Sequence, residues 1–361
     1  MAAAKKTNSK VEEKNRYVAY VSTYTMKDDV GIRIYDVDVE AGKLKAKDQV
    51  KITNSSYLTM THNRKFLYGI TDMGVEGFKI KEDGSLESIN TASINGMRGC
   101  YLSTDYEDKF LFVAGYHDAK VTVLKLNEDG SVGEITDEIF NAGIGSIVER
   151  SFRPHVTCTK MTRDNKFLCV CDLGMDQVKI YSLNHITGKL KFVDMIHSQQ
   201  DSAPRYIKFH KNGKFAYVIH EVGCSIDVYS YEVVGNMPNF TKIQTVTTFN
   251  DSYHTSSCLA CALKLSFDHK LLMCSNAGEN SVAVFEINEE DGTLNKAFVL
   301  PVSGDYPKDV GFFPDSKHIV SLNHESNTMS FFDLNMDDKL IVMSSPFLNV
   351  DKGNCIIMKR L

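Results

Sequence analysis

The chain has 361 residues, of which 43% are hydrophobic and 24% are charged, proportions typical of a folded globular protein and not of a disordered one. The formal net charge of −5 argues against a nucleic-acid partner, because such a partner needs a surface that neutralises many phosphates. No run of apolar residues approaches 18, so we expect no membrane-spanning helix and no membrane partner.

The first residues, 1–15, are polar and lack the apolar core of a signal peptide. We therefore expect a flexible N-terminus followed by a single domain over residues 16–361. The nine cysteines are an odd number without a signal peptide, which indicates reduced thiols in the cytoplasm. Cys258 and Cys261 form a CxxC pair that has no matching second pair, so we predict no metal and no cofactor.

A strand-like motif of the type Lys-Phe-Leu-Tyr recurs along the chain at intervals of 44 to 57 residues. In most copies it follows a polar turn, as in Lys65-Phe66-Leu67-Tyr68. Repetition at such a period is the mark of an array of similar structural units. The seven copies begin at Arg16, Lys65, Lys109, Lys166, Lys214, Lys270 and Lys317.

A second motif follows each copy of the first, as an alternating strand that runs into an acidic or glycine turn. Its β-branched and aromatic residues favour β-strands, and its Glu-Asp-Gly turns, at 82–84 and 128–130, favour hairpins. Seven units of about four short strands each predict an all-β fold, a seven-bladed β-propeller. The second motif ends at Leu44, Leu86, Val132, Leu190, Asn236, Leu294 and Leu340.

The two ends of the chain predict how the ring closes. The first unit starts directly with the strand at Tyr17–Ser22 and lacks the segment that precedes this strand in the other units. The C-terminal residues 354–358 resemble that missing segment. We therefore expect the N- and C-terminal strands to pair in one blade, which removes an open sheet edge.

Cationic residues stand near the start of most segments that should form the innermost strands. In a propeller these strand starts meet at a mouth of the central channel, so we expect a positive pocket for an anion such as a carboxylate or a phosphate. Arg153 lies two residues before one of them and is a further candidate for binding substrate. The set is Arg98, His155, Arg205, Lys264 and Lys308.

A second set of polar residues follows the Lys-Phe-Leu motifs, where these strands end. Glu221 interrupts a strand in this set, and beside Arg205 and His155 its carboxylate could act as a general base. Asp172 is interpreted as a turn former, and His62, His197, His210 and His220 as surface turn residues. The other members are Asp72, Tyr116 with His117, Asn276, and Asn323 with His324. The segment 143–152 is the longest candidate for a functional loop between blades.

At these residues the chain resembles the lactonase family of seven-bladed propellers, which includes bacterial 6-phosphogluconolactonases and fungal carboxy-muconate cyclases. The likeness spans nearly the whole sequence from Val21 onward, and its specific part is the ordered series Arg153-Pro154-His155, Asp172-Leu173-Gly174 and Ala203-Pro204-Arg205. The segment from Gly145-Ser146 to Glu149-Arg150 is also similar to a stretch of the family. The sequence departs from the family pattern at Thr157, Ala262, Ala277 and Lys308.

Their positions make Arg98, Arg153, Lys264 and Lys308 candidate substrate contacts, and the resemblance implies a catalytic site of His155, Arg205 and Glu221. It implies hydrolysis of a small anionic sugar lactone, with 6-phospho-glucono-1,5-lactone as the first choice. We expect a monomer or a weak dimer. Two alternatives stay open: an isomerase similar to the muconate cyclases, which the same site could serve, and a propeller that binds a ligand or protein without catalysis.

Overall fold

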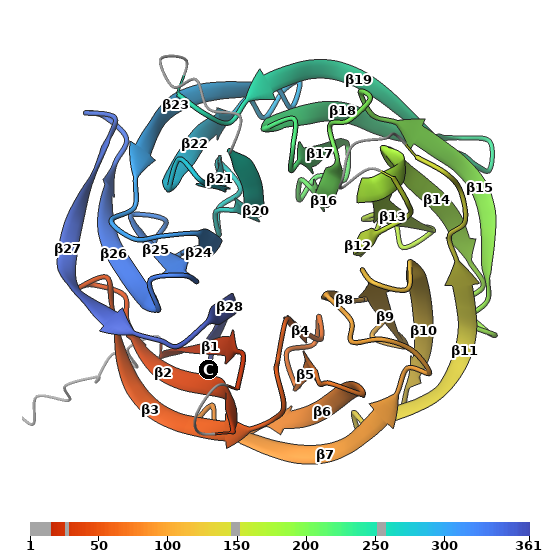
Figure 1. The fold of residues 1–361 in the computed structure, drawn as a ribbon, viewed down its shortest axis with the longest axis horizontal. Helices are drawn as coiled ribbons and strands as arrows, with labels where there is room; N and C mark the ends of the chain where they lie inside the picture. The colour runs from red at the N-terminus through yellow and green to blue at the C-terminus, as the bar shows by residue number, and fades with distance from the viewer. Residues whose placement is uncertain (1–15, 26–28, 146–151, 251–257) are drawn as a thin grey trace, which may run out of the picture.

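Seven four-stranded antiparallel sheets surround a central axis in the computed structural model, which describes residues 16–25, 29–145, 152–250 and 258–361 (Figure 1). The prediction of a seven-bladed all-β propeller is confirmed. The N-terminal residues 1–15, for which we predicted flexibility, lie outside the described residues. In the described part of the chain, no helix is long and apolar enough to cross a membrane.

Each blade runs from an innermost strand at the axis to an outermost strand at the rim (Figure 1). The blade that joins the two chain ends consists of β28 (Gly353–Arg360), β1 (Tyr17–Thr23), β2 (Val30–Asp38) and β3 (Lys43–Lys51). The next three blades are β4 (Leu58–Met60), β5 (Phe66–Ile70), β6 (Gly74–Ile80) and β7 (Leu86–Ser93); β8 (Tyr101–Thr104), β9 (Phe110–Gly115), β10 (Lys120–Leu126) and β11 (Val132–Phe140); and β12 (Val156–Met161), β13 (Phe167–Asp172), β14 (Gln177–Leu183) and β15 (Leu190–His197).

The last three blades complete the circle in chain order. They are β16 (Pro204–Phe209), β17 (Phe215–His220), β18 (Ser225–Val234) and β19 (Met237–Thr247); β20 (Leu259–Leu265), β21 (Leu271–Ala277), β22 (Ser281–Ile287) and β23 (Leu294–Pro301); and β24 (Pro307–Phe312), β25 (His318–Asn323), β26 (Thr328–Asn335) and β27 (Leu340–Asn349). One short 3-10 helix, η1 (Leu173–Met175), links β13 to β14.

The ring closes as the sequence predicts. The C-terminal strand β28 pairs antiparallel with β1, with Tyr20 opposite Ile357 and Val21 opposite Ile356. One blade therefore contains strands from both ends of the chain, and its hydrogen bonds join these ends. This pairing gives β1 an inner neighbour and covers what would otherwise be an open edge.

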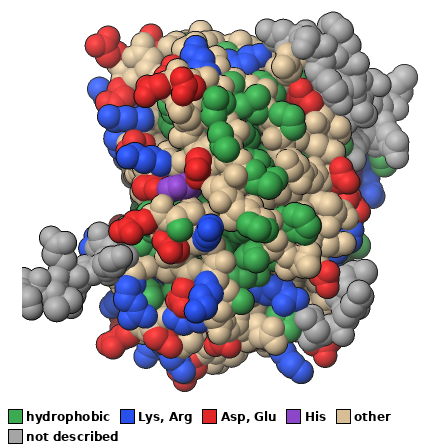
Figure 2. Space-filling model, turned by 90° about the vertical axis from the view of Figure 1, so that its left-hand side faces the viewer, with side chains coloured by type: hydrophobic (Ala, Val, Ile, Leu, Met, Phe, Trp, Pro, Cys, Tyr) green, Lys and Arg blue, Asp and Glu red, His purple; other side chains and the backbone are tan. Residues whose placement is uncertain are grey.

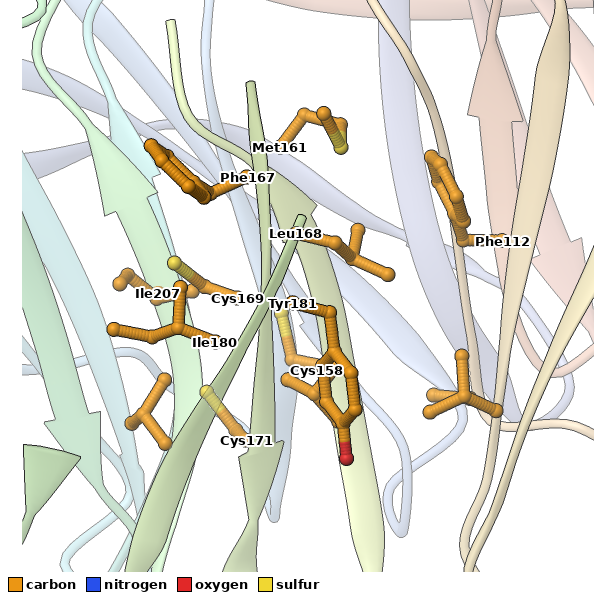
Figure 3. Close-up of a cluster of buried hydrophobic side chains, with 14 of the residues drawn as sticks. Phe112, Cys158, Met161, Phe167, Leu168, Cys169, Cys171, Ile180, Tyr181 and Ile207 are labelled. Carbon is orange, nitrogen blue, oxygen red and sulfur yellow. The ribbon is translucent and has the colours of Figure 1, made fainter. Parts of the chain in front are cut away.

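The core lies between neighbouring blades. Every residue of β13 is buried, whereas the outermost strand of the same blade, β15, has only exposed and partly buried side chains. Figure 3 shows Phe112, Leu168, Cys169 and Ile207, which come from three successive blades and belong to one cluster of buried side chains. Burying each large apolar side chain contributes about 2 kcal/mol, so the inner strands hold the ring rigid around its axis.

Tyrosine hydroxyls of inner strands reach the tight turns of adjacent blades. Tyr20 donates a hydrogen bond to the carbonyl of Gly84 at 2.8 Å, and Tyr68 donates to that of Gly130 at 3.0 Å. Gly130 has a φ of +85°, and a Cβ there would lie 2.2 Å from the ring of Phe66. Both the backbone conformation and the close approach require glycine, so the Glu-Asp-Gly turns also serve the packing between blades.

The rim of the ring is polar with scattered apolar side chains. Figure 2 shows acidic and basic side chains interspersed with hydrophobic ones on one side of the molecule. On the outermost strand β27, Val342, Met343 and Phe347 are exposed. Exposed hydrophobic side chains are common on folded domains, because polar atoms alone do not cover the whole surface.

Candidate active site

A cavity of about 540 Å³ lies at the end of the axis where the innermost strands begin. This volume falls in the range of small-molecule sites. Figure 1 shows why residues distant in sequence meet there: the innermost strands of all blades face the same axis. The lining residues are Tyr24, Ser56, Tyr57, Arg98, Gly99, Cys100, Tyr116, His117, Phe152, Arg153, His155, Thr157, Arg205, Tyr206, Glu221, Tyr306, Lys308 and Asn354.

The His155 side chain is fixed by contacts from neighbouring segments. Its ring stacks on the ring of Tyr116 with centroids 4.2 Å apart, and Nδ1 lies 2.8 Å from the carbonyl oxygen of Tyr116. Since a carbonyl only accepts, Nδ1 carries the proton in this hydrogen bond. The neutral imidazole then has its lone pair on Nε2, the nitrogen that can accept a proton.

The backbone of His155 is anchored as well. Its N–H donates to Oδ1 of the buried Asp172 at 2.9 Å, and Nδ2 of Asn141 donates to Oδ2 of the same carboxylate at 2.6 Å. The interpretation of Asp172 as only a turn former was therefore incomplete. It ends β13, and its carboxylate also holds the segment that presents His155.

The environment of His155 keeps the imidazole neutral. Burial lowers the pKa of His155, the hydrogen bond to Tyr116 opposes this effect, and the positive charge of Arg153 adds to the lowering. At neutral pH the ring is therefore in the form that accepts a proton.

Arg205 and Glu221 form an ion pair at the same cavity. Arg205 lies on β16, and Glu221 directly follows β17, the strand that pairs with β16. Nη1 of Arg205 contacts Oε2 of Glu221, which is almost fully buried. The guanidinium also lies over the ring of Tyr206, 5.1 Å from its centroid. The carboxylate thus orients the guanidinium, which faces the cavity with a fixed positive charge.

A second cationic corner is built around Tyr24. The Arg98 guanidinium lies 4.9 Å from the centroid of this ring, and the Lys308 amino group lies 4.8 Å from it. Arg98 pairs with Asp72 at 3.2 Å, while Lys308 donates to Oδ1 of Asn354 at 2.7 Å. Burial, with Arg205 and Arg98 nearby, lowers the pKa of Lys308 to about 8. This corner can bind an anionic group of a ligand.

Of the two remaining residues predicted to bind substrate, one lines the cavity and the other does not. Arg153 lines the cavity with its guanidinium 5.5 Å from the ring centroid of Phe152. Lys264 points elsewhere: its amino group pairs with Asp309 at 2.9 Å, and it is not among the described residues that line the cavity. The prediction for Lys264 is wrong because this residue is the sixth of the seven in β20, near the end of the strand and not at its start, where Asp309 on the adjacent inner strand holds its amino group.

The segment 143–152 ends beside the cavity, where Phe152 is a lining residue. Gly145 donates a backbone hydrogen bond to Phe152 at 3.2 Å. Residues 146–151, which carry most of the similarity to the family in this segment, lie outside the described residues.

The other polar strand ends stabilise the blades. Nδ2 of Asn276 donates to the carbonyl of Thr248 at 2.7 Å, and Nδ2 of Asn323 donates to Oγ of Ser330 at 2.8 Å. The interpretation of His210 and His220 as surface residues was wrong, since both are 1% exposed. Each ends or directly follows an inner strand, where the packing of adjacent blades covers it.

Several lining residues were not singled out from the sequence, among them Tyr24, Tyr306 and Asn354. A signal was present, because tyrosine recurs at the innermost strand starts, at Tyr57, Tyr101, Tyr206 and Tyr306. Rings from three blades come together at the axis: Tyr57 and Tyr101 have centroids 4.4 Å apart, and Tyr101 and Tyr206, whose blades are separated by the blade of β12, 5.3 Å apart. Of these four tyrosines, Tyr57, Tyr206 and Tyr306 line the cavity and form apolar walls beside its cationic groups.

All nine cysteines are free. In the described ranges, one His/Asp/Glu group has ligand atoms within 4.8 Å of one another, namely Asp105, Glu107 and His185. It does not fit a metal well, because the Asp105 carboxylate already accepts hydrogen bonds from the backbone N–H groups of Glu107, Lys109 and Phe110. None of the three lines the cavity.

Comparison with known proteins agrees with this architecture. A 6-phosphogluconolactonase of Bacillus subtilis is 30% identical over 349 residues, which cover 94% of this chain and 98% of that protein. An uncharacterized protein of Staphylococcus saprophyticus is 31% identical over 316 residues, 85% of this chain and 89% of that protein. A crystal structure of a protein from Bacteroides fragilis superposes with a TM-score of 0.87 at 26% identity, covering 96% of this chain and 99% of that one.

The family model described as lactonase, 7-bladed beta-propeller, matches residues 18–358, nearly the whole described ring. Of the four departures from the family pattern, Thr157 and Lys308 line the cavity, whereas Ala262 and Ala277 are buried. The chain therefore belongs to the lactonase family of seven-bladed β-propellers.

Proposed function

We propose that this protein hydrolyses 6-phospho-glucono-1,5-lactone to 6-phosphogluconate, a step of the pentose phosphate pathway, in the cytoplasm. One observation carries the proposal: a single cavity holds a neutral histidine of fixed tautomer together with separate cationic groups at Arg205 and at the Arg98–Lys308 corner. Hydrolysis of this lactone needs a base that takes a proton from water, a positive charge that stabilises the oxyanion, and a positive charge that binds the phosphate. The name of the Bacillus subtilis relative supports the same choice.

His155 is the proposed general base. Nε2 takes a proton from a water molecule, and the water oxygen forms a bond to the lactone carbonyl carbon. The ester bond to the ring oxygen then breaks, and the imidazolium returns its proton to that oxygen. The products are a carboxylic acid and a hydroxyl group, and all atoms and charges balance without a metal or cofactor.

Arg205 is the proposed oxyanion stabiliser. The negative charge that develops on the carbonyl oxygen gains most from a cation already held in place. The ion pair with Glu221 supplies that orientation. Because the Glu221 carboxylate is engaged by Arg205, we assign the base role to His155 and a positioning role to Glu221.

Arg98 and Lys308 are the proposed phosphate contacts, and Arg153 is a third candidate. Both cations lie against Tyr24, and the partner of Lys308, Asn354, is neutral. The Lys308 amino group keeps two further N–H donors for an incoming oxyanion. A phosphorylated lactone would therefore be favoured over its unphosphorylated form.

The test is a coupled assay. Fresh 6-phosphogluconolactone is followed through 6-phosphogluconate dehydrogenase and formation of NADPH, with spontaneous hydrolysis subtracted. We expect a rate proportional to protein concentration and a clearly lower kcat/KM for glucono-1,5-lactone, measured by acid release. A rate no greater than spontaneous hydrolysis with both substrates would contradict the proposal and favour a propeller that only binds its ligand.

Replacement of Lys308 tests the phosphate contact. We expect Lys308→Met to raise KM for the phosphorylated lactone about tenfold, because one charge-assisted contact is lost, and to leave KM for glucono-1,5-lactone nearly unchanged. Lys264→Met is the matched control, since its amino group pairs with Asp309. An equal KM change for both substrates would refute the assignment.

A further inference from the structure

A second group of cations lies at the opposite end of the axis from the cavity. The innermost strands begin at the cavity and run to this far end, where turns connect them to the next strands. Lys160 is near the end of β12, Arg163 is in the turn that follows, and Lys208 is near the end of β16. Together with His62 and Tyr106, these residues are named here the far-end cluster.

Tyr106 is the ring around which the cluster is arranged. The His62 ring stacks on it with centroids 4.3 Å apart, the Arg163 guanidinium lies 5.5 Å from its centroid, and the Lys160 amino group 5.9 Å. Lys160, Arg163 and Tyr106 are partly buried, whereas His62 is exposed. Solvent and small solutes can therefore reach a place where several basic side chains converge.

Among the described residues, no carboxylate forms an ion pair with Lys160 or Arg163. In the described part of the chain, the Lys160 amino group has no hydrogen bond or ion pair, and Nη2 of Arg163 donates to the carbonyl of Phe209 at 3.3 Å. Nε of Arg163 is buried without a partner among the described residues. Buried cations without counter-charges are costly, and a bound anion removes that cost.

The nearby aspartates are already used by the turns. Asp108 accepts the backbone N–H groups of His62 and Asn63 at 2.7 and 2.9 Å. Asp164 accepts the backbone N–H of Lys166 and the hydroxyls of Thr162 and Tyr231. These carboxylates stabilise turn geometry, and no ion pair links them to Lys160 or Arg163 among the described residues.

The electrostatics of Lys160 agree with this geometry. Burial, followed by the charges of Lys208 and Arg163, lowers the pKa of Lys160 to about 7. A lysine in such surroundings marks a candidate binding site. An oxyanion next to the amino group would favour its charged form.

We propose that the far-end cluster binds a small oxyanion of the phosphate class, held by Lys160 and Arg163, while Lys208, whose amino group donates to the Tyr101 hydroxyl at 3.1 Å, adds positive charge nearby. The ligand is either inorganic phosphate or the phosphate group of a small metabolite. This site is separate from the cavity and does not depend on the proposed hydrolysis.

Site-resolved lysine acetylation tests the proposal. Full-length protein is treated briefly with acetic anhydride at pH 7, and the modification of each lysine is quantified by peptide mass spectrometry. Inorganic phosphate is compared with chloride at equal ionic strength, and 6-phosphogluconate is a second arm. We expect phosphate to slow acetylation of Lys160 at least about threefold while exposed Lys166, in the same turn as Arg163, is unaffected.

Protection by both phosphates assigns the site to the phosphate group itself, and protection by 6-phosphogluconate alone assigns it to an organic phosphate. Protection that is equal in chloride, or none in any arm, would overturn the proposal.

Variants provide an independent readout. We expect Arg163→Met to raise about tenfold the phosphate concentration that gives half-maximal protection of Lys160, because one charge-assisted contact is lost. Lys166→Met should leave the midpoint unchanged. Unaltered protection in folded Arg163→Met, with folding checked by circular dichroism, would remove Arg163 and the proposed geometry from the site.

Discussion

Both ends of the propeller axis carry cationic side chains, but the cations at the two ends differ in their ion-pair and hydrogen-bond partners. At the cavity three cations have specific polar partners: Glu221 for Arg205, Asp72 for Arg98 and Asn354 for Lys308. At the far end Lys160 has no such partner among the described residues. A polar partner holds a cation in one orientation, and stabilisation of a transition state requires a cation with a fixed orientation. Unpartnered charge creates a general attraction for anions, and this suits binding without chemistry.

The comparison is tested most strongly by removing one histidine from each end. We expect His155→Ala to lower kcat at least ~100-fold, because general base catalysis is lost. His62→Ala removes an exposed histidine of the far-end cluster and should leave kcat within about twofold. The measurement is the coupled lactonase assay. Similar rates for both variants would show that His155 is not the base.

A smaller effect is expected from the ion pair at the cavity. Glu221→Gln keeps the shape of the side chain but removes its charge, so Arg205 becomes less well oriented. We expect kcat to fall about tenfold, with KM changed less than twofold. The acid limb of the pH–rate profile should persist, since it belongs to His155. Disappearance of that limb in Glu221→Gln would instead identify Glu221 as the base.

The smallest effects come from pH. Because burial lowers the pKa of His155 below its usual 6.5, kcat/KM should fall to half of its plateau value only at a pH below 6.5, as the imidazole becomes charged. The pKa of Lys308 is about 8, so KM for the phosphorylated lactone should rise a few-fold above pH 8, where the amino group loses its proton. Initial rates from pH 5 to 9 measure both limbs.

At the far end, the same reasoning predicts that anion binding is lost at a lower pH than at the cavity. The groups around Lys160 are Lys208, Arg163, His62 and Cys158, and its pKa of about 7 means that phosphate protection should weaken from pH 7 upward. Protection of Lys160 that increased between pH 7 and 9 would contradict the difference between the two ends.

Most of the fold prediction came from the two sequence motifs that recur seven times along the chain. Each copy of the Lys-Phe-Leu motif became a buried second strand, as in β9 and β13. The closing strand β28 was also predicted, because one unit lacked its inner strand at the start and the C-terminus resembled it. Strand periodicity and turn residues are local properties, so they can be read from sequence.

The site was less accessible to sequence reasoning. The strand-start positions of Arg98, Arg205 and Lys308 correctly placed their side chains at one cavity. Lys264 does not share that position, because β20 begins five residues earlier, at Leu259, and the Lys264 amino group instead pairs with Asp309, 45 residues further along the chain. Sequence reasoning also missed Tyr24, which two cations approach from different blades.

The sequence by itself determined the strands, the seven units and the way the ring closes, since these follow from alternation, turn chemistry and repetition. Only the tertiary structure decided which polar side chains share a cavity and which bind their neighbours. It fixed the tautomer of His155 through Tyr116 and the ion pair of Arg205 with Glu221. The physical reason is distance: these contacts join residues from strands and loops that the chain brings together only when the blades close around one axis.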